Sequence, residues 1–231
     1  MNSEFSSVEA VQKYLPLMYE LAIRLDHISK AFDGNLGLSA PFAYEYAYFQ
    51  FRRVCELIAL GCLTLHGDIP ALQKSSTKKE WNAERIMNLL HQNYSYAFPE
   101  CISKYQDSLG WHIQANSKPN ALSRSEFKDL YSECGHVLHR GTIKTVEISR
   151  DLNTEMYKKA MTWHSKLVDL MSEHAVTRSS QKGMYVISLK TNSGYPECSI
   201  FTEVRPGELS VHTQKMSVSD QLKHSYIAKT E

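Results

Sequence analysis

The chain has 231 residues, of which 42% are hydrophobic and 22% are charged, a composition typical of a globular protein and not of a disordered or fibrous one. Its 26 Lys and Arg residues against 25 Asp and Glu residues give a formal charge of +1, which excludes a polybasic nucleic-acid binder. The length fits one domain, or one domain with an appendage.

The amino terminus and the cysteines indicate where the protein resides. The first ten residues, MNSEFSSVEA, contain neither the basic nor the apolar region of a secretory signal, so we expect a cytoplasmic protein. The most apolar stretch, residues 54–65, is shorter than the roughly 20 residues that span a bilayer, so we expect no membrane anchor. The five cysteines form no C-x-x-C pair, which is typical of reduced thiols in a core.

Two long helices are predicted in the first 67 residues. A capping box formed by Ser6 and Glu9 begins the first, whose apolar residues recur at spacings of three and four until Phe32. Pro16 lies inside this helix and predicts a kink or a restart there. The second helix begins near Pro41 and ends near Gly67. Its second half is apolar on every side, so we expect it to be central.

Further helices are predicted over residues 79–92, from the capping box of Ser123 and Glu126 to Gly141, and over residues 153–174. The segment between them, residues 93–120, is rich in Pro, Gly, Asn and Ser, which predicts irregular structure.

The hydrophobic period changes from helical to alternating after Gly183. The runs MYVISLK and CSIFTEV predict a β-hairpin, which we expect to pack on the helices, on a third strand near residues 209–212 or on a second subunit. The expected fold is therefore mainly α, a helical bundle of four to five helices with a C-terminal β-hairpin. We expect a bundle over residues 1–178 and a hairpin appendage with a polar tail over residues 179–231.

The first candidate site lies on the second helix, where Glu56 stands among apolar residues one turn after Arg52 and Arg53. Because an isolated buried carboxylate is strongly disfavoured, Glu56 requires a cationic partner. The three residues form either a structural ion pair that fixes helix register or a polar site in which Glu56 accepts a proton or binds a ligand.

A second candidate cluster is Cys134, His136, His139 and Arg140. One helix cannot present all of these side chains together, because the helical wheel turns Cys134 and His136 to opposite sides. His139 and Arg140 instead suit the last turn of a helix, where cations complement the helix dipole. The chain contains no Walker A loop, no dinucleotide-binding fingerprint, no nucleophile elbow and no H-E-x-x-H, so we expect no cofactor and no metal.

The central helix with the sequence QFRRVCELIAL, a later helix that ends in LHRG and a final long helix together resemble the HEPN (higher eukaryotes and prokaryotes nucleotide-binding) superfamily over residues 6–175. Active HEPN proteins carry R-x(4-6)-H in a metal-independent ribonuclease site across a dimer interface. Within residues 6–175 only Arg85 and His91 have that spacing, with Ile86 where the family has a polar residue.

The resemblance implies a binding or regulatory module in stress or phage defence, with a second copy of the chain, RNA or a protein as partner. A first alternative is a metal-independent endoribonuclease. Its site would combine Arg52 or Arg53, Glu56, His139 and Arg140, with an arginine stabilising charge and His139 as acid or base. A second alternative is a small-ligand-binding module whose pocket is made by residues 93–120.

Overall fold

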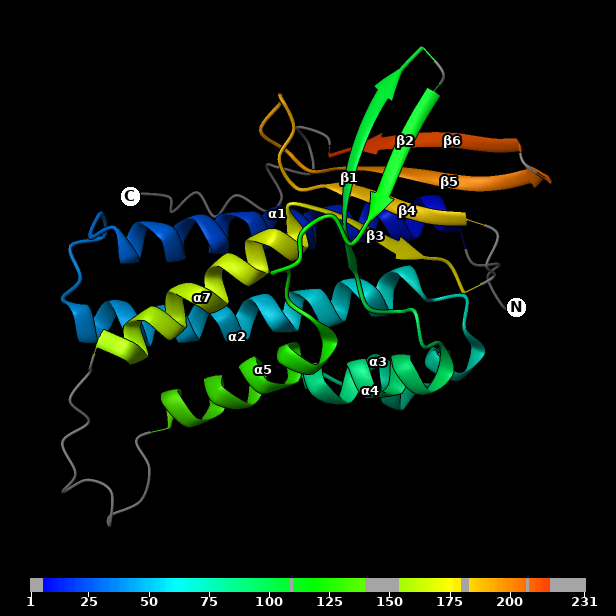
Figure 1. The fold of residues 1–231 in the computed structure, drawn as a ribbon. Helices are drawn as coiled ribbons and strands as arrows, with labels where there is room; N and C mark the ends of the chain where they lie inside the picture. Colours follow the sequence, from blue (N-terminus) through cyan, green and yellow to red (C-terminus); the bar gives the residue numbers. More distant parts are fainter. Residues whose placement is uncertain (1–5, 109, 140–153, 180–182, 207, 217–231) are drawn as a thin grey trace, which may run out of the picture.

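The computed structural model describes residues 6–108, 110–139, 154–179, 183–206 and 208–216. Helices form one layer and an antiparallel sheet forms the other, with the sheet packed against the first and the last long helix of the chain (Figure 1). The bounds of the helices are α1 (Ser7–Phe32), α2 (Ala40–Leu65), a 3₁₀ helix (Pro70–Gln73), α3 (Ser75–Lys78), α4 (Ala83–Asn93), α5 (Arg124–Leu138) and α7 (Thr154–Met171).

The helix starts follow the predicted capping chemistry. The Ser6 side chain accepts a hydrogen bond from the backbone of Glu9 at the start of α1, and α1 then continues through Pro16 as a single helix. The capping box of Ser123 and Glu126 at the start of α5 is complete. The central position expected for α2 is confirmed, because α2 contacts α1, α4, α5 and α7.

The sheet has six strands in the order β2-β1-β3-β4-β5-β6, and all neighbouring strands are antiparallel. Their bounds are β1 (Glu100–Asp107), β2 (Gly110–Ala115), β3 (Glu173–Thr177), β4 (Gly183–Ser188), β5 (Glu197–Arg205) and β6 (Glu208–Lys215). Strands β1 and β2 form a hairpin that projects away from the helices (Figure 1).

The predicted fold class, a mainly α bundle with only a C-terminal hairpin, is therefore wrong. Residues 93–120 contain β1 and β2 instead of irregular structure, and the end of the predicted last helix is β3. The alternation of apolar and polar residues in β1 is weak because the hairpin projects away from the helices and the rest of the sheet. From Tyr105 onward the β1 side chains are therefore exposed on both faces. Strand β3 directly follows α7 and is too short to show an alternating hydrophobic pattern of its own.

The hairpin predicted after Gly183 is confirmed as β4 and β5, and the third strand expected near residues 209–212 is β6. This hairpin also pairs on its other side with β3, from Glu173 opposite Ser188 to Thr177 opposite Met184. Strands from both sides of residue 178 thus share one sheet. The expected polar tail, residues 217–231, lies outside the described residues.

The sheet curls away from the helices. On its outer face the Lys104 ammonium of β1 lies 3.8 Å from a carboxylate oxygen of Glu197 on β5. Strands β3 and β4 lie between them, so a flat sheet would separate the two backbones by about 14 Å. The curvature brings β1 and β5 toward each other over a small apolar cluster, which consists of Ile102, Ala175, Val186 and Phe201.

The main core lies between the helices and the inner face of the sheet and includes residues from every long helix. The expected burial of the five cysteines is confirmed, and all five are free thiols. None of the described helices is long and apolar enough to cross a membrane.

Candidate functional site

The structure brings Arg52, Arg53 and Glu56 together on α2. Glu56 accepts a hydrogen bond of 2.8 Å from Arg53 and one of 3.4 Å from Arg52. The Arg52 guanidinium also lies 5.3 Å from the centre of the Tyr131 ring on α5. Both oxygens of Glu56 are thus occupied by the chain's own guanidinium groups, as a structural ion pair requires.

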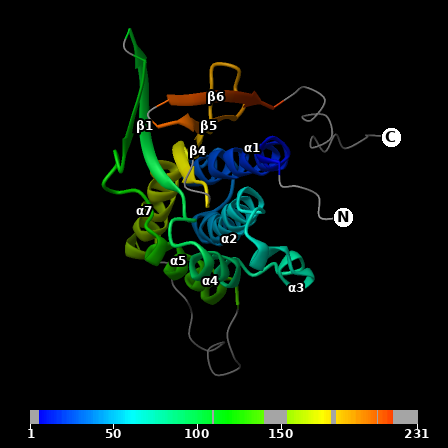
Figure 2. The same ribbon diagram turned by 90° about the vertical axis from the view of Figure 1, so that its right-hand side faces the viewer.

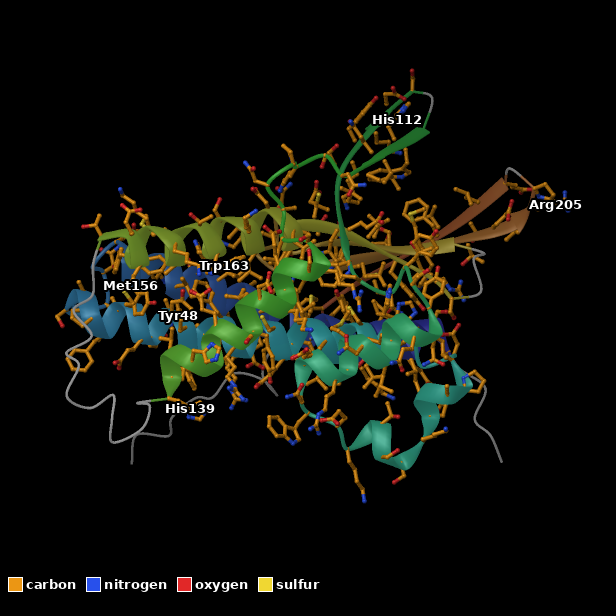
Figure 3. The ribbon with its side chains drawn as sticks, turned by 60° about the horizontal axis from the view of Figure 1, so that its bottom comes forward. Tyr48, His112, His139, Met156, Trp163 and Arg205 are labelled. Carbon is orange, nitrogen blue, oxygen red and sulfur yellow. The ribbon has the colours of Figure 1, made fainter. Side chains whose placement is uncertain are left out.

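His139 lies apart from this cluster within one chain. It follows the last residue of α5, where its backbone N–H donates to the Gly135 carbonyl, and Figure 3 shows it at the outer end of that helix. Helices α2 and α5 are antiparallel, since Tyr48 contacts Glu133 whereas Arg52 contacts Tyr131. His139 therefore lies more than about 10 Å along α5 from the level of Arg52. Arg140 lies outside the described residues.

The pair Arg85 and His91 lies on α4, where both side chains are exposed, and Arg85 approaches Glu80 at 3.8 Å. The residue between them that takes the polar position of the HEPN motif, Ile86, is completely buried.

A carboxylate that the sequence does not single out, Glu133, connects three helices. It accepts hydrogen bonds from the Tyr48 hydroxyl (2.6 Å) and the Trp163 indole (3.2 Å), and its carboxylate lies 2.7 Å from the Lys159 ammonium. Tyr48 and Trp163 lie close together between the helices (Figure 3). Burial, and then the hydrogen bond to Glu133, raises the pKa of Tyr48, so this hydroxyl stays a donor. Three donors of the chain itself therefore surround the Glu133 carboxylate.

A hollow of about 500 Å³ lies beside Glu133, between α2, α5 and α7. Its lining includes two carboxylates, Asp129 and Glu133, and one ammonium group, Lys159. The charged lining therefore has an excess of one negative charge, which disfavours a phosphodiester backbone.

A second cavity, of about 430 Å³, lies between α1, α7 and the end of the sheet where β3 begins and β4 ends. This volume is within the range of small-molecule sites. Its apolar lining consists of Ala22, Leu25, Val168 and Leu189, and its polar lining of Asp26, Ser29, His164, Ser172, Glu173 and Lys190.

His164 has a defined protonation state in the wall of this cavity. Its Nε2 lies 2.9 Å from the backbone oxygen of Leu25, and because a carbonyl oxygen only accepts, Nε2 carries the proton. Burial lowers the pKa of His164, so the ring is neutral at pH 7 and Nδ1 keeps its lone pair. No described residue forms a hydrogen bond with Nδ1, so this residue of the cavity lining carries an unused acceptor.

The charged groups of the cavity differ in how far the chain satisfies them. Asp26 lies 2.7 Å from the Lys30 ammonium, and this hydrogen bond is the main cause that lowers the pKa of Asp26, with Lys190 adding to it. Glu173 accepts a hydrogen bond of 3.2 Å from the Ser188 hydroxyl. Ser172 accepts a hydrogen bond from Lys118, whose side chain approaches from another hollow.

The ligand pocket expected from residues 93–120 has only a partial counterpart. A hollow of about 270 Å³ lies at the base of the β1–β2 hairpin and is lined by Asn116, Lys118 and the residues around Pro99 and Leu122. The larger cavity at His164 could not be found from the sequence, because its lining comes from three distant segments with no common motif. Within the described part of the chain, no group of three or more His, Cys, Asp or Glu residues could hold a metal ion.

Comparison with known proteins gives no match for this chain among protein-family models, curated proteins or solved structures. The HEPN resemblance therefore stays a prediction.

Proposed function

We propose that the protein is a binding module for a small organic molecule, held in the cavity between α1, α7 and the end of the sheet. The observation that carries this proposal is the wall of the cavity, in which a neutral His164 with an unused acceptor stands beside an apolar lining. Small-molecule sites typically combine such an apolar surface with a few fixed polar groups. The regulatory role in stress or phage defence that the HEPN resemblance implies is compatible with a ligand-binding module.

The lining indicates the chemistry of the ligand. Leu25, Val168 and Leu189 favour an apolar body, aromatic or branched aliphatic. The Nδ1 atom of His164 can only accept, so the ligand should carry a hydroxyl or N–H donor. A ligand without that donor would leave Nδ1 desolvated and unpaired, at a cost of about 1–3 kcal/mol.

A matched pair of probes tests the proposal. Phenol carries a hydroxyl donor, whereas anisole has the same ring with the donor blocked by a methyl group. We expect phenol to shift the backbone amide NMR signals of residues near Leu25, His164 and Leu189, and to bind about tenfold more tightly than anisole. In His164→Phe this preference should disappear.

A cavity-filling variant tests the location. Val168 lines the cavity on α7, and Val168→Trp should abolish binding of both probes. Met161 is 49% exposed on the same helix and does not line the cavity, so Met161→Trp is the matched control and should bind phenol normally. Phenol binding that survives Val168→Trp, or that shifts signals only elsewhere, would overturn the proposal.

A further inference from the structure

One side of α2 is uncovered along much of its length. Viewed along this helix, α1 lies above it, α7 and α5 lie on one side and α4 lies below (Figure 2). On the remaining side, the nearest described helix is the short α3, which follows the C-terminal end of α2 in the chain (Figure 2). The N-terminal half of α2 therefore presents a face that no described helix packs against.

Two phenylalanines are exposed on this face. Phe42 is 64% exposed and Phe49 is 46% exposed, although most apolar side chains of α2 are buried. They are seven positions apart, which places both on the same side of a helix. Exposed aromatic residues in one patch are typical of interaction surfaces, because burying them in a contact removes a large apolar area from water.

Charged residues flank Phe49 on both sides at the spacing of one helical turn. Arg53 lies four residues after Phe49, with its guanidinium 6.0 Å from the centre of the Phe49 ring. Glu45 lies four residues before Phe49, is exposed, and forms no ion pair with any residue that the structure describes. The row Glu45, Phe49, Arg53 thus runs along the face with an acid at one end, an aromatic ring in the middle and a base at the other end.

We infer that this face of α2 binds a second copy of the chain through a two-fold contact centred on Phe49. Rows of residues four apart are the ridges that pack against each other in the commonest class of helix pairs. When two such helices are antiparallel about a two-fold axis at Phe49, Glu45 of each copy meets Arg53 of the other. The row is therefore complementary to itself in charge, and a second copy is the partner that its sequence matches.

The ion pairs already present do not prevent this contact. Arg53 is 52% exposed and uses one of its N–H groups for Glu56. A guanidinium has five N–H donors in a fixed fork, so Arg53 can hold Glu56 and Glu45 of the second copy together. The inference does not depend on the ligand cavity, because that cavity is lined from α1, α7 and the sheet.

Sedimentation equilibrium of the full chain tests the contact through a charge swap. Glu45→Arg alone and Arg53→Glu alone each place like charges opposite each other, and each should weaken the dimer at least about tenfold. The double variant Glu45→Arg/Arg53→Glu restores opposite charges and should return the dissociation constant to within about threefold of the wild type. Phe49→Glu should give a monomer.

Far-ultraviolet circular dichroism shows whether each variant is folded, and Tyr105→Glu is the matched control. Tyr105 is 59% exposed on the β1–β2 hairpin, away from α2, so its variant should dimerise as the wild type does. A wild-type chain that is monomeric at every concentration up to about millimolar would overturn the inference. If the dimer persists in Phe49→Glu, another surface forms it. If the double variant does not restore the dimer, Glu45 and Arg53 do not meet across it. Either result would overturn the inference.

Discussion

Two histidines show how the interior of this protein differs from the wall of its cavity. His174, on β3, and His164, on α7, each have one ring nitrogen at a backbone carbonyl, Nδ1 at Met171 (3.0 Å) and Nε2 at Leu25 (2.9 Å) respectively. The second nitrogen of His174 lies 2.7 Å from the Tyr14 hydroxyl, whereas that of His164 meets no described partner. Both rings are neutral at pH 7, so a charge map would not distinguish them. His164 differs from His174 in having a ring nitrogen without a hydrogen-bond partner on a residue that lines a cavity. This difference distinguishes a candidate binding residue from a structural one.

The largest predicted effect is on the pH dependence of stability. Burial lowers the pKa of His174 to about 4 from its ordinary value near 6.5, so the unfolded chain binds an extra proton between these pH values. The free energy of unfolding should therefore be greatest above pH 6.5 and fall as the pH is lowered toward 4, by about 3 kcal/mol for this one group. Urea unfolding at a series of pH values measures the fall.

Variants assign this pH dependence to its source. His174→Gln removes the titrating group, so the fall between pH 6.5 and 4 should become smaller even if the variant is less stable at every pH. Burial also lowers the pKa of His66 to about 4, and His66→Gln should remove a comparable part of the fall. An unchanged fall in both variants would show that neither histidine is held neutral by the fold.

The second predicted effect concerns Glu133, whose bonds are supplied by its own chain, as those of His174 are. Glu133→Ala leaves the Tyr48 hydroxyl and the Trp163 indole without their acceptor and should lower the free energy of unfolding by about 2–3 kcal/mol. Glu133→Gln keeps an acceptor and should cost less. Phenol binding at the cavity should be unaffected in either variant, and a loss of binding in a folded Glu133→Gln would break the distinction between the two regions.

The helices and the C-terminal hairpin could be predicted because their signals are local. Capping residues such as Ser6 and Ser123 act within one turn. The alternation in β4 reflects Tyr185 and Ile187, which face the main core. The β1–β2 hairpin could not be predicted in this way, because its exposed half carries no burial pattern. The sheet as a whole depends on pairing between β1 and β3, which are distant in sequence.

The candidate site was less predictable than the fold. The grouping of Arg52, Arg53 and Glu56 follows from helical spacing and is present, whereas the position of His139 relative to them depends on how α5 packs against α2. His164 could not be identified from the sequence, because a single histidine on an amphipathic helix matches no motif. Its role as a candidate site residue follows from its hydrogen bond to the Leu25 carbonyl and from the cavity that it lines. Charge clusters are visible in a sequence, but unused hydrogen-bonding capacity is visible only in three dimensions.

The smallest predicted effect separates the two arginines that hold Glu56. The Arg52 side chain is 29% exposed and lies over the Tyr131 ring, whereas that of Arg53 is 52% exposed. Replacement by Met keeps the alkyl stem and removes the charge, so Arg52→Met should cost about 1 kcal/mol of stability and Arg53→Met about 0.3 kcal/mol. Urea unfolding at low protein concentration measures both without a contribution from self-association. If Arg53→Met proves the more costly, the exposed Arg53 stabilises Glu56 more than the half-buried Arg52 does. Glu56 would then be part of the surface of α2 and not of the contact between α2 and α5.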